Sequence, residues 1–419
     1  MVILSNPTGN TIVRAIARAL RRAGWLEGLY TTIAFPDPGP RWWLPKAVRD
    51  QLLRRHFEVE YSFVHTHPAL ESTRLVAAAL RRRVLVRPGG MASPEAVYRD
   101  FDRHVARVIA SRTLPATVRT AYAYEDAAED TFRAARARDL SCIYELPIAH
   151  WETVQRLLHE EAERLPAWRQ TIQGLDDSPA KLERKRNELE LADAIVVPSR
   201  FVMDSLPAHI KATKQCVLAP FGAPSALAVP DAVHRDAGRP LRVMFAGAMT
   251  QRKGLADVFA AMRLLNRRDV ELVVLGAMNA PMSFYREQYR DFIYEGTRPH
   301  ADVLAVMRTC DVLVLPALAE GRALVQQEAL ASGLALIVTA NAGGDDLVEE
   351  GRTGFIVPIR SPEAIAERIA WFADHRQLLP EFRRHAVRKA AETGWAGYEN
   401  RVLDVVRASF ERSLHPVAS

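Results

Sequence analysis

Cysteine is scarce in this chain, which contains three in 419 residues. Cys142, Cys216 and Cys310 stand far apart and lack the spacing of metal ligands, so the sequence predicts reduced, structural thiols and excludes a disulfide framework. Because structural disulfides are characteristic of oxidising compartments, we expect a cytoplasmic protein.

Long apolar runs are also missing. No run approaches the roughly 18 residues that a membrane-spanning helix needs. The first five residues, Met-Val-Ile-Leu-Ser, lack the basic segment that opens a secretory signal. No internal repeat of roughly 20 to 50 residues is visible. With 48% hydrophobic and 25% charged residues, the chain is expected to form two globular domains.

Positive charge is concentrated in the first part of the chain. Residues 1–120 carry 19 Lys and Arg against 9 Asp and Glu, an excess of +10, whereas the whole chain is only +6. Arginines cluster at residues 18–22, 54–55 and 81–83. These clusters either lie on solvated helix faces or attract an anionic partner. Of such partners, a membrane surface or a lipid-linked acceptor is favoured. Nucleic acid is not expected, because nearby aromatic residues form no known binding module.

The first half begins like a Rossmann domain. A predicted strand at residues 2–5, a turn at 6–10 and a helix to Gly24 follow one another. The turn holds one glycine, so it does not match the dinucleotide fingerprint G-x-G-x-x-G. Further strands predicted at 31–35, 63–65, 83–86 and 120–124 alternate with helices, which indicates a parallel sheet covered on both faces. The charged helical region 152–191 is interpreted as mostly solvated surface.

The second half repeats this alternation after a polar, Pro-containing linker at residues 223–240. Strands are predicted at 241–245, 271–276, 312–315 and 336–339, and helices at 255–265, 362–373 and 398–410.

The stretch from Val312 to Pro358 has the pattern of a nucleotide site in an α/β protein. Its strand ends at Pro316, and a helical pattern begins just after Glu320 and stops near Gly333. Ligands of open α/β sheets bind at such strand ends. The free N–H groups of Arg322, Ala323 and Leu324 would form an anion site for a pyrophosphate.

Two glutamates accompany that helix. Glu320 and Glu328 would lie roughly 12 Å apart along a regular helix, too far to share a metal. They suit hydroxyl groups at the two ends of an elongated ligand, such as a sugar and a ribose flanking a diphosphate. The alternative is a glutamate favoured by the helix dipole and a second that is solvated.

The whole pattern resembles a known family. E-x7-E, then A-x-G-L-A-L-I, A-G-G-D-D-L-V and G-R-T-G-F-I-V-P, resembles the signature of family 4 retaining glycosyltransferases of GT-B fold, in detail over residues 242–369. The resemblance implies an α/β protein with two Rossmann-like domains facing a cleft. The acceptor-side domain would be 1–222 and the donor domain 223–395, with 396–419 returning to the first.

The resemblance also implies an activity. It is the transfer of a sugar, with retention, from a nucleotide diphosphate sugar to a glycan, lipid-linked or small-molecule acceptor, without a metal or other cofactor. In relatives a G-R-x-x-x-x-K-G loop clamps the donor pyrophosphate. Lys253 fits this pattern, but Ala248 replaces the arginine, and Arg252 is the candidate substitute because a guanidinium binds phosphate in bidentate fashion. Arg322 and Ala323 stand where relatives often have Phe and Gly.

The candidate residues follow from this resemblance. Glu320 would position a sugar hydroxyl and Glu328 the ribose diol, and Gly276 would let the backbone approach a ligand. The donor-binding set is Gly247, Arg252, Lys253, Gly276, Glu320, Gly321, Arg322, Ala323, Leu324 and Glu328. The catalytic candidates are Glu320, Lys253, His150 and Glu145, and the acceptor-side candidates are Thr8, Gly9 and Asn10. For His150 and Glu145, hydrogen bonding between the domains is the alternative.

Three other interpretations concern a metal motif and two alternative functions. Asp100 and Asp102 match the D-x-D metal motif of GT-A glycosyltransferases, which we reject because residues two apart on a helix do not face one another. The missing arginine at Ala248 leaves open a catalytically decayed nucleotide-sugar-binding partner. A sugar nucleotide epimerase is a further alternative, because it uses the same fold.

Overall fold

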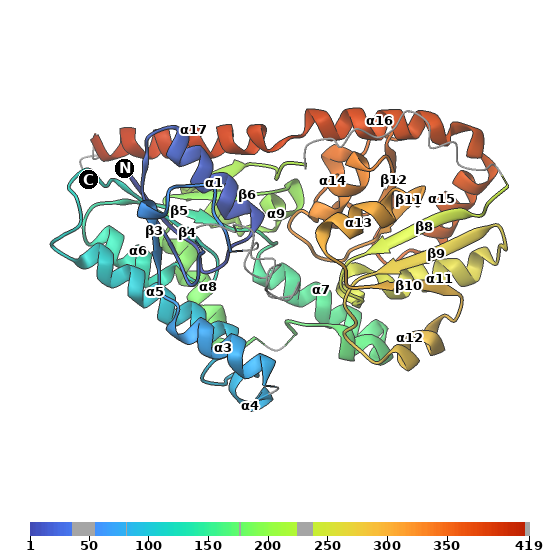
Figure 1. The fold of residues 1–419 in the computed structure, drawn as a ribbon, viewed down its shortest axis with the longest axis horizontal. Coiled ribbons are helices and arrows are strands. Elements are labelled where there is room, and N and C mark those ends of the chain that lie inside the picture. Colours follow the sequence, from blue (N-terminus) through green and yellow to red (C-terminus); the bar gives the residue numbers. More distant parts are fainter. Residues whose placement is uncertain (36–54, 81, 176, 224–237, 415–419) are drawn as a thin grey trace, which may run out of the picture.

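The computed structural model describes residues 1–35, 55–80, 82–175, 177–223 and 238–414. Two parallel sheets lie at the centres of two lobes (Figure 1). The first has the order β3-β2-β1-β4-β5-β6-β7 and the second β10-β9-β8-β11-β12-β13. Counted along the chain, the second order is 3-2-1-4-5-6, that of a Rossmann fold. The first extends the same order by one strand.

The first lobe holds the strands β1 (Val2–Ser5), β2 (Leu26–Thr31), β3 (Val64–Thr66), β4 (Thr120–Tyr124), β5 (Ser141–Glu145), β6 (Ala194–Val197) and β7 (Gln215–Leu218). The helices in its described part are α1 (Thr11–Arg22), η1 (Tyr61–Phe63), α3 (Ala69–Ala79), α4 (Arg83–Val86), α5 (Pro94–Ala110), α6 (Glu129–Arg136), α7 (Trp151–Arg164), η2 (Pro166–Thr171), α8 (Pro179–Leu191), α9 (Arg200–Ser205) and α10 (Ala208–Thr213).

The second lobe holds the strands β8 (Leu241–Ala246), β9 (Val270–Leu275), β10 (Phe292–Gly296), β11 (Val312–Leu315), β12 (Ala335–Val338) and β13 (Gly354–Ile356). Its described helices are η3 (Gln251–Lys253), α11 (Leu255–Leu265), α12 (Met282–Gln288), α13 (His300–Met307), α14 (Leu324–Ala331), η4 (Ala340–Ala342), η5 (Asp345–Leu347), α15 (Pro362–Asp374), η6 (Arg376–Leu378) and α16 (Leu379–Glu392), followed by α17 (Trp395–Leu414). Every residue of β11 and β12 is buried, as expected of parallel strands covered by helices on both faces.

Helix α17 runs from the second lobe back along the first (Figure 1). Tyr398, Val402 and Val406 join the hydrophobic core between α1 and the first sheet. Arg18 and Arg22 of α1 both pair with Glu399, at 2.6 and 2.9 Å. The predicted return of the last helix, and with it the GT-B arrangement, is confirmed.

A second crossing runs in the opposite direction. Trp168 of η2 packs against Phe259, Phe284 and Tyr285 in the core of the second lobe. Glu161 of α7 is fully buried and pairs with arginines of both lobes. The interpretation of residues 152–191 as mostly solvated surface is therefore wrong where the charged side chains lie between packed elements, as for Glu161, Arg184, Lys185 and Glu188.

Two predicted strands of the first lobe are also wrong. Residues 83–86 form the short helix α4, and β2 ends at Thr31 where residues 31–35 were expected to be a strand. Short apolar runs have no periodicity that separates strand from helix, so the neighbouring elements decide. Most of the predicted linker lies in residues 224–237, outside the described residues. No helix within the described ranges is both long and apolar enough to cross a bilayer.

The two aspartates of the D-x-D sequence have separate partners. Asp102 accepts hydrogen bonds from the backbone of Asp130 and Thr131 at the start of α6, whereas Asp100 pairs with His67. Helix geometry turns them to different neighbours, as the rejection of this motif assumed.

Candidate functional site

Three charged side chains meet at the carboxyl edge of the second sheet. Lys253 and Arg252 lie in η3, after β8, and Glu320 lies in the loop after the adjacent strand β11. The Lys253 Nζ is 2.7 Å and the Arg252 Nη1 3.0 Å from the same oxygen of Glu320, Oε1. We call these residues the donor-side cluster. Residues of two sequence motifs almost 70 positions apart thus come together at one edge of the sheet.

Glycines make this convergence sterically feasible. At Gly247, where φ is +143°, a Cβ would stand 2.8 Å from the Lys253 side chain. At Gly254, where φ is +79°, it would stand 2.2 Å from the carbonyl oxygen of Pro316. The loop after β8 can therefore lie directly against the end of β11.

The donor-side cluster is charged and carries an excess positive charge. Burial acts to raise the pKa of Glu320, but attraction to Lys253 and Arg252 outweighs it and lowers that pKa below its ordinary value. Glu320 is thus ionised at neutral pH and offsets one of the two cations. A diphosphate would find a guanidinium and an ammonium together here.

The predicted start of helix α14 needs correction. The helix begins at Leu324, not directly after Glu320, and the N–H of Ala323 donates to the carbonyl of Ala342 at 3.1 Å. The Arg322 guanidinium is buried, donates to the carbonyl of Gly343 and pairs with Asp346. The prediction that the N–H of Ala323 belongs to an anion site is therefore wrong. The carbonyl that accepts this hydrogen bond lies in the loop after β12, and the periodicity of residues along α14 cannot show such a contact.

Two candidate glycines serve close contacts within the chain. At Gly321 a Cβ would stand 1.6 Å from the carbonyl oxygen of Pro147, and Ser199 Oγ donates to the Gly321 carbonyl at 2.5 Å. The two lobes therefore meet at this residue. At Gly276 a Cβ would stand 1.8 Å from the carbonyl oxygen of Gly247, so the close approach expected with a ligand is made to another loop.

Glu328 has a partner that the sequence did not indicate. Its Oε1 lies 2.9 Å from Nε2 of His300, at the start of α13. The hydrogen bond to Glu328 raises the pKa of His300. The Glu328 side chain is mostly buried, whereas the His300 ring is largely exposed. A ligand that binds Glu328 would share or displace this histidine.

Glu145 and His150 form their hydrogen bonds with residues outside the donor-side cluster. Glu145 is fully buried and accepts hydrogen bonds from the hydroxyls of Tyr122 and Tyr398, which ties β5 to β4 and α17. Burial raises its pKa to about 7, because these hydrogen bonds compensate only in part. The backbone N–H of His150 donates to Ser205, and burial lowers the pKa of its imidazole to about 4. A catalytic role for either residue stays a prediction.

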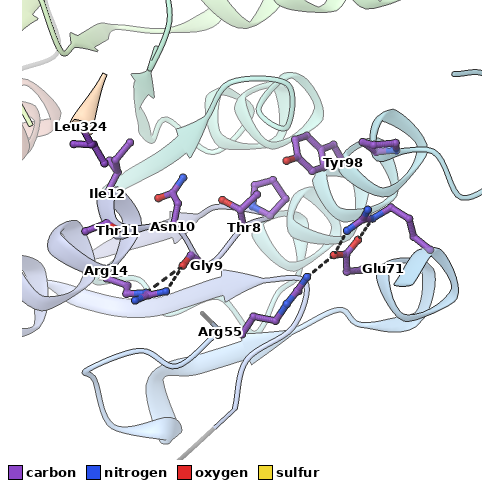
Figure 2. Close-up of a pocket in the computed structure, with 13 residues that line it drawn as sticks. Thr8, Gly9, Asn10, Thr11, Ile12, Arg14, Arg55, Glu71, Tyr98 and Leu324 are labelled. Carbon is purple, nitrogen blue, oxygen red and sulfur yellow. Dashed lines mark hydrogen bonds and ion pairs between the residues drawn. The ribbon is translucent and has the colours of Figure 1, made fainter. Parts of the chain in front are cut away.

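A cavity of about 530 Å³ opens between the first lobe and the start of α14. It is lined by Thr8, Gly9 and Asn10, and by Leu324 from the second lobe. Figure 2 shows Leu324 and Asn10 at one end of this acceptor-side cavity and Glu71 and Tyr98 at the other. The Asn10 side chain accepts from the N–H of Val13 and so caps α1, which fixes the loop.

Among the lining residues that sequence reasoning missed are three charged side chains that pair with one another. Glu71 is buried and bridges Arg55, at 2.7 Å, and Arg74, at 2.6 Å. Burial opposes ionisation of Glu71, but hydrogen bonds from Arg74 and Arg55 lower its pKa. We call these residues the acceptor-side triad. One sequence signal was available, because Glu71 is the only acidic residue between positions 61 and 94.

Comparisons of fold place the chain in a class. Over 98% of its length it matches sucrose-phosphate synthase from Thermosynechococcus elongatus, with a TM-score of 0.61, 16% identity and 99% of that chain covered. Anabaena HepE in complex with UDP matches over 97% of this chain and 99% of its own, with a TM-score of 0.61 and 13% identity. At this identity the similarity shows the fold alone, which is GT-B.

Comparisons of sequence find glycosyltransferase relatives, with a family-model match limited to the region of the second lobe. Residues 231–393 match the family model described as glycosyl transferases group 1, which confirms the resemblance. A putative colanic acid biosynthesis glycosyltransferase, WcaL of Salmonella typhimurium, is 31% identical over 34% of this chain and 38% of its own length. D-inositol 3-phosphate glycosyltransferase of Corynebacterium glutamicum is 28% identical over 57% of this chain and 63% of its own. The matches thus span less than two thirds of these relatives.

Proposed function

We propose that the chain transfers a glycosyl group from a nucleotide diphosphate sugar to an acceptor bound in the acceptor-side cavity. The observation that carries the proposal is the donor-side cluster, in which two cations meet one carboxylate inside the part of the chain that matches group 1 glycosyl transferases. The cavity next to it supplies room for a second substrate.

Each charged residue has a role in this proposal. Lys253 and Arg252 stabilise the negative charge that develops on the leaving diphosphate, so no metal is needed for that step. Arg252 takes the place of the arginine absent at Ala248, because it reaches the same carboxylate oxygen as Lys253. Glu320 accepts a hydrogen bond from a sugar hydroxyl, and Glu328 binds the ribose. Transfer is proposed to occur with retention at the anomeric carbon.

The first experiment is nucleotide binding. Thermal unfolding is followed with UDP, GDP and ADP, and UDP is tried first because the similar HepE was solved with UDP. We expect one diphosphate to stabilise the protein and Lys253→Gln to abolish that shift. Lys181→Gln, which changes a lysine on α8 paired with Asp177, is the matched control. Equal shifts in wild type and Lys253→Gln contradict the donor site.

The second experiment separates transfer from the two alternatives. Release of nucleoside diphosphate that depends on an added acceptor, and that persists in EDTA, supports metal-independent transfer. Interconversion of sugar nucleotides without an acceptor indicates an epimerase. Nucleotide binding without turnover, and without slow donor hydrolysis, indicates a decayed partner. The anomeric proton coupling of the product, measured by NMR, decides between retention and inversion.

A further inference from the structure

Exposed hydrophobic side chains gather on one projection of the first lobe. In the described part of the chain, eight large hydrophobic residues are exposed, and four lie within 16 residues of one another. They are Val76, Leu80, Val84 and Met91, with 58, 66, 66 and 78% of their surface exposed. We call these four residues the tip patch. Single exposed apolar residues are ordinary, but a group on one projection marks an interaction surface.

The chain segment that carries the tip patch has charged residues of one sign only. Residues 72–94 contain five arginines and neither aspartate nor glutamate. Arg74 turns inward to Glu71, whereas Arg82 and Arg87 are exposed beside the patch. Aliphatic side chains interleaved with arginines form a surface that is apolar and cationic at once.

The position of the tip patch relates it to the cavity. Helix α3 carries Glu71 and Arg74 of the acceptor-side triad in its first half and Val76 at its second half. Pro94 and Tyr98, directly after the patch, also line the cavity. Figure 1 shows α3 and α4 projecting from the first lobe on the side away from α16 and α17. The tip patch therefore lies between cavity-lining residues along the chain, after Arg74 and before Pro94.

We propose that the tip patch docks the chain on the surface of an anionic phospholipid bilayer. The aliphatic side chains enter the boundary between headgroups and acyl chains, while Arg82 and Arg87 bind lipid phosphates. A projecting, acid-free surface suits a flat anionic layer. Docking does not require the proposed glycosyl transfer. If both hold, the cavity faces the membrane, and the acceptor would be a lipid-linked molecule.

Vesicle flotation tests the proposal with the full chain. Vesicles of phosphatidylglycerol and phosphatidylcholine are compared with vesicles of phosphatidylcholine alone, at low and high salt. We expect wild type to float with the anionic vesicles, and to do so less at high salt, because surface attraction is screened. Arg82→Glu with Arg87→Glu should weaken binding by more than tenfold, since each arginine near the surface contributes about fivefold.

Matched variants separate the patch from general effects. Leu80→Glu with Val84→Glu should also abolish flotation, whereas Leu264→Glu, at an exposed leucine of α11, and Arg268→Glu, at an exposed arginine of the second lobe, should leave it within twofold of wild type. Equal losses in patch and control variants would overturn the proposal, and so would a wild type that floats with neither vesicle. Wild-type dimers that dissociate in Leu80→Glu would instead assign the patch to a second copy of this chain.

The nucleotide shift distinguishes failure of docking from failure of the proposed function. All patch variants should keep the diphosphate-induced thermal shift without vesicles, because the patch lies outside the donor-side cluster. Vesicle binding without any nucleotide shift would leave docking in place and contradict the transfer alone.

Discussion

The donor-side cluster and the acceptor-side triad have the same electrostatic composition. Each places one mostly buried glutamate between two cations: Glu320 between Lys253 and Arg252, and Glu71 between Arg55 and Arg74. In both, the cations keep the carboxylate ionised despite its burial. The two sites therefore present a net positive charge from opposite lobes.

They differ in how the chain builds them. The donor-side cluster comes from loops that directly follow two adjacent strands, where glycines permit close approach. The acceptor-side triad comes from a helix and from a residue beside the undescribed range 36–54, without a glycine motif. Loops at strand ends leave a pattern in the sequence, whereas the pairing of Glu71 with Arg55, 16 residues earlier in the chain, does not. Sequence reasoning therefore identified the glutamate with its two cations in the second lobe and missed the similar group in the first lobe.

Glu320→Gln should have the largest effect and tests whether the two sites differ in role. The variant loses a carboxylate beside the proposed reacting centre, and contacts of this kind are worth about 100- to 1000-fold in turnover. Release of nucleoside diphosphate at saturating donor measures it. Glu71→Gln should change mainly the KM for the acceptor. If Glu71→Gln lowers kcat as much as Glu320→Gln does, the distinction between donor and acceptor sides is lost.

Gly321→Ala tests the contact that joins the lobes at the donor side. The added Cβ would meet the backbone of Pro147, so the loop that carries Glu320 must move. We expect turnover to fall by about 100-fold, as for displacements near 1 Å in other active sites. Overpacking should also lower the free energy of unfolding by roughly 1–3 kcal/mol. Gly397→Ala, where a Cβ meets nothing within 4 Å, is the control: it should leave turnover nearly unchanged and should not lower the free energy of unfolding, because Ala favours the helix more than Gly does.

Glu145→Gln tests how a buried carboxylate behaves without cations beside it, because the hydrogen-bond partners of Glu145 are tyrosines. Its folded-state pKa of about 7 lies above the ordinary 4.5. Between these pH values the folded state binds more protons than the unfolded state, so stability falls as pH rises through this window. At pH 8 the variant should be more stable than wild type by roughly 1–3 kcal/mol, and near pH 4 it should not differ. Urea unfolding at both pH values measures this.

Glu71→Gln supplies the contrasting result for the same measurement. Because the Glu71 pKa is lowered by Arg74 and Arg55, its charge stabilises the folded protein above the ordinary pKa and ceases to do so in acid. The variant should therefore lose stability at pH 8. A gain at that pH would show that the two arginines do not compensate the buried charge.

His300→Ala should have the smallest effect. The largely exposed histidine pairs with Glu328, and such pairs contribute less than about 1 kcal/mol. If Glu328 binds the ribose, removal of this competitor should raise diphosphate affinity by no more than about threefold. The raised pKa of His300 makes the pair strongest in acid, so the gain should be larger at pH 6 than at pH 8.5. Calorimetric titration measures it, and a loss of affinity would make His300 a ligand itself.

Particular elements show how far sequence reasoning reached. The strands β1, β4 and β11 and the helices α11 and α15 were predicted nearly at their bounds, because their apolar patterns match one period throughout. The strand predicted at residues 83–86 is wrong, because four residues are too few to show the period of a strand or of a helix. The prediction that the N–H of Ala323 is free to bind an anion is wrong, because its hydrogen-bond acceptor belongs to a loop almost 20 residues away.

The sequence by itself determined the alternation of strands and helices, the two separate motifs that carry Lys253 and Glu320, and the acid-free segment at 72–94. These are properties of neighbours along the chain. Only the tertiary structure decided that Arg252 reaches Glu320, that His300 pairs with Glu328, that Glu145 anchors α17 and that Arg55 joins Arg74 in pairing with Glu71. Charges interact through space over a few ångströms, and the order of residues does not specify which ones packing will bring that close.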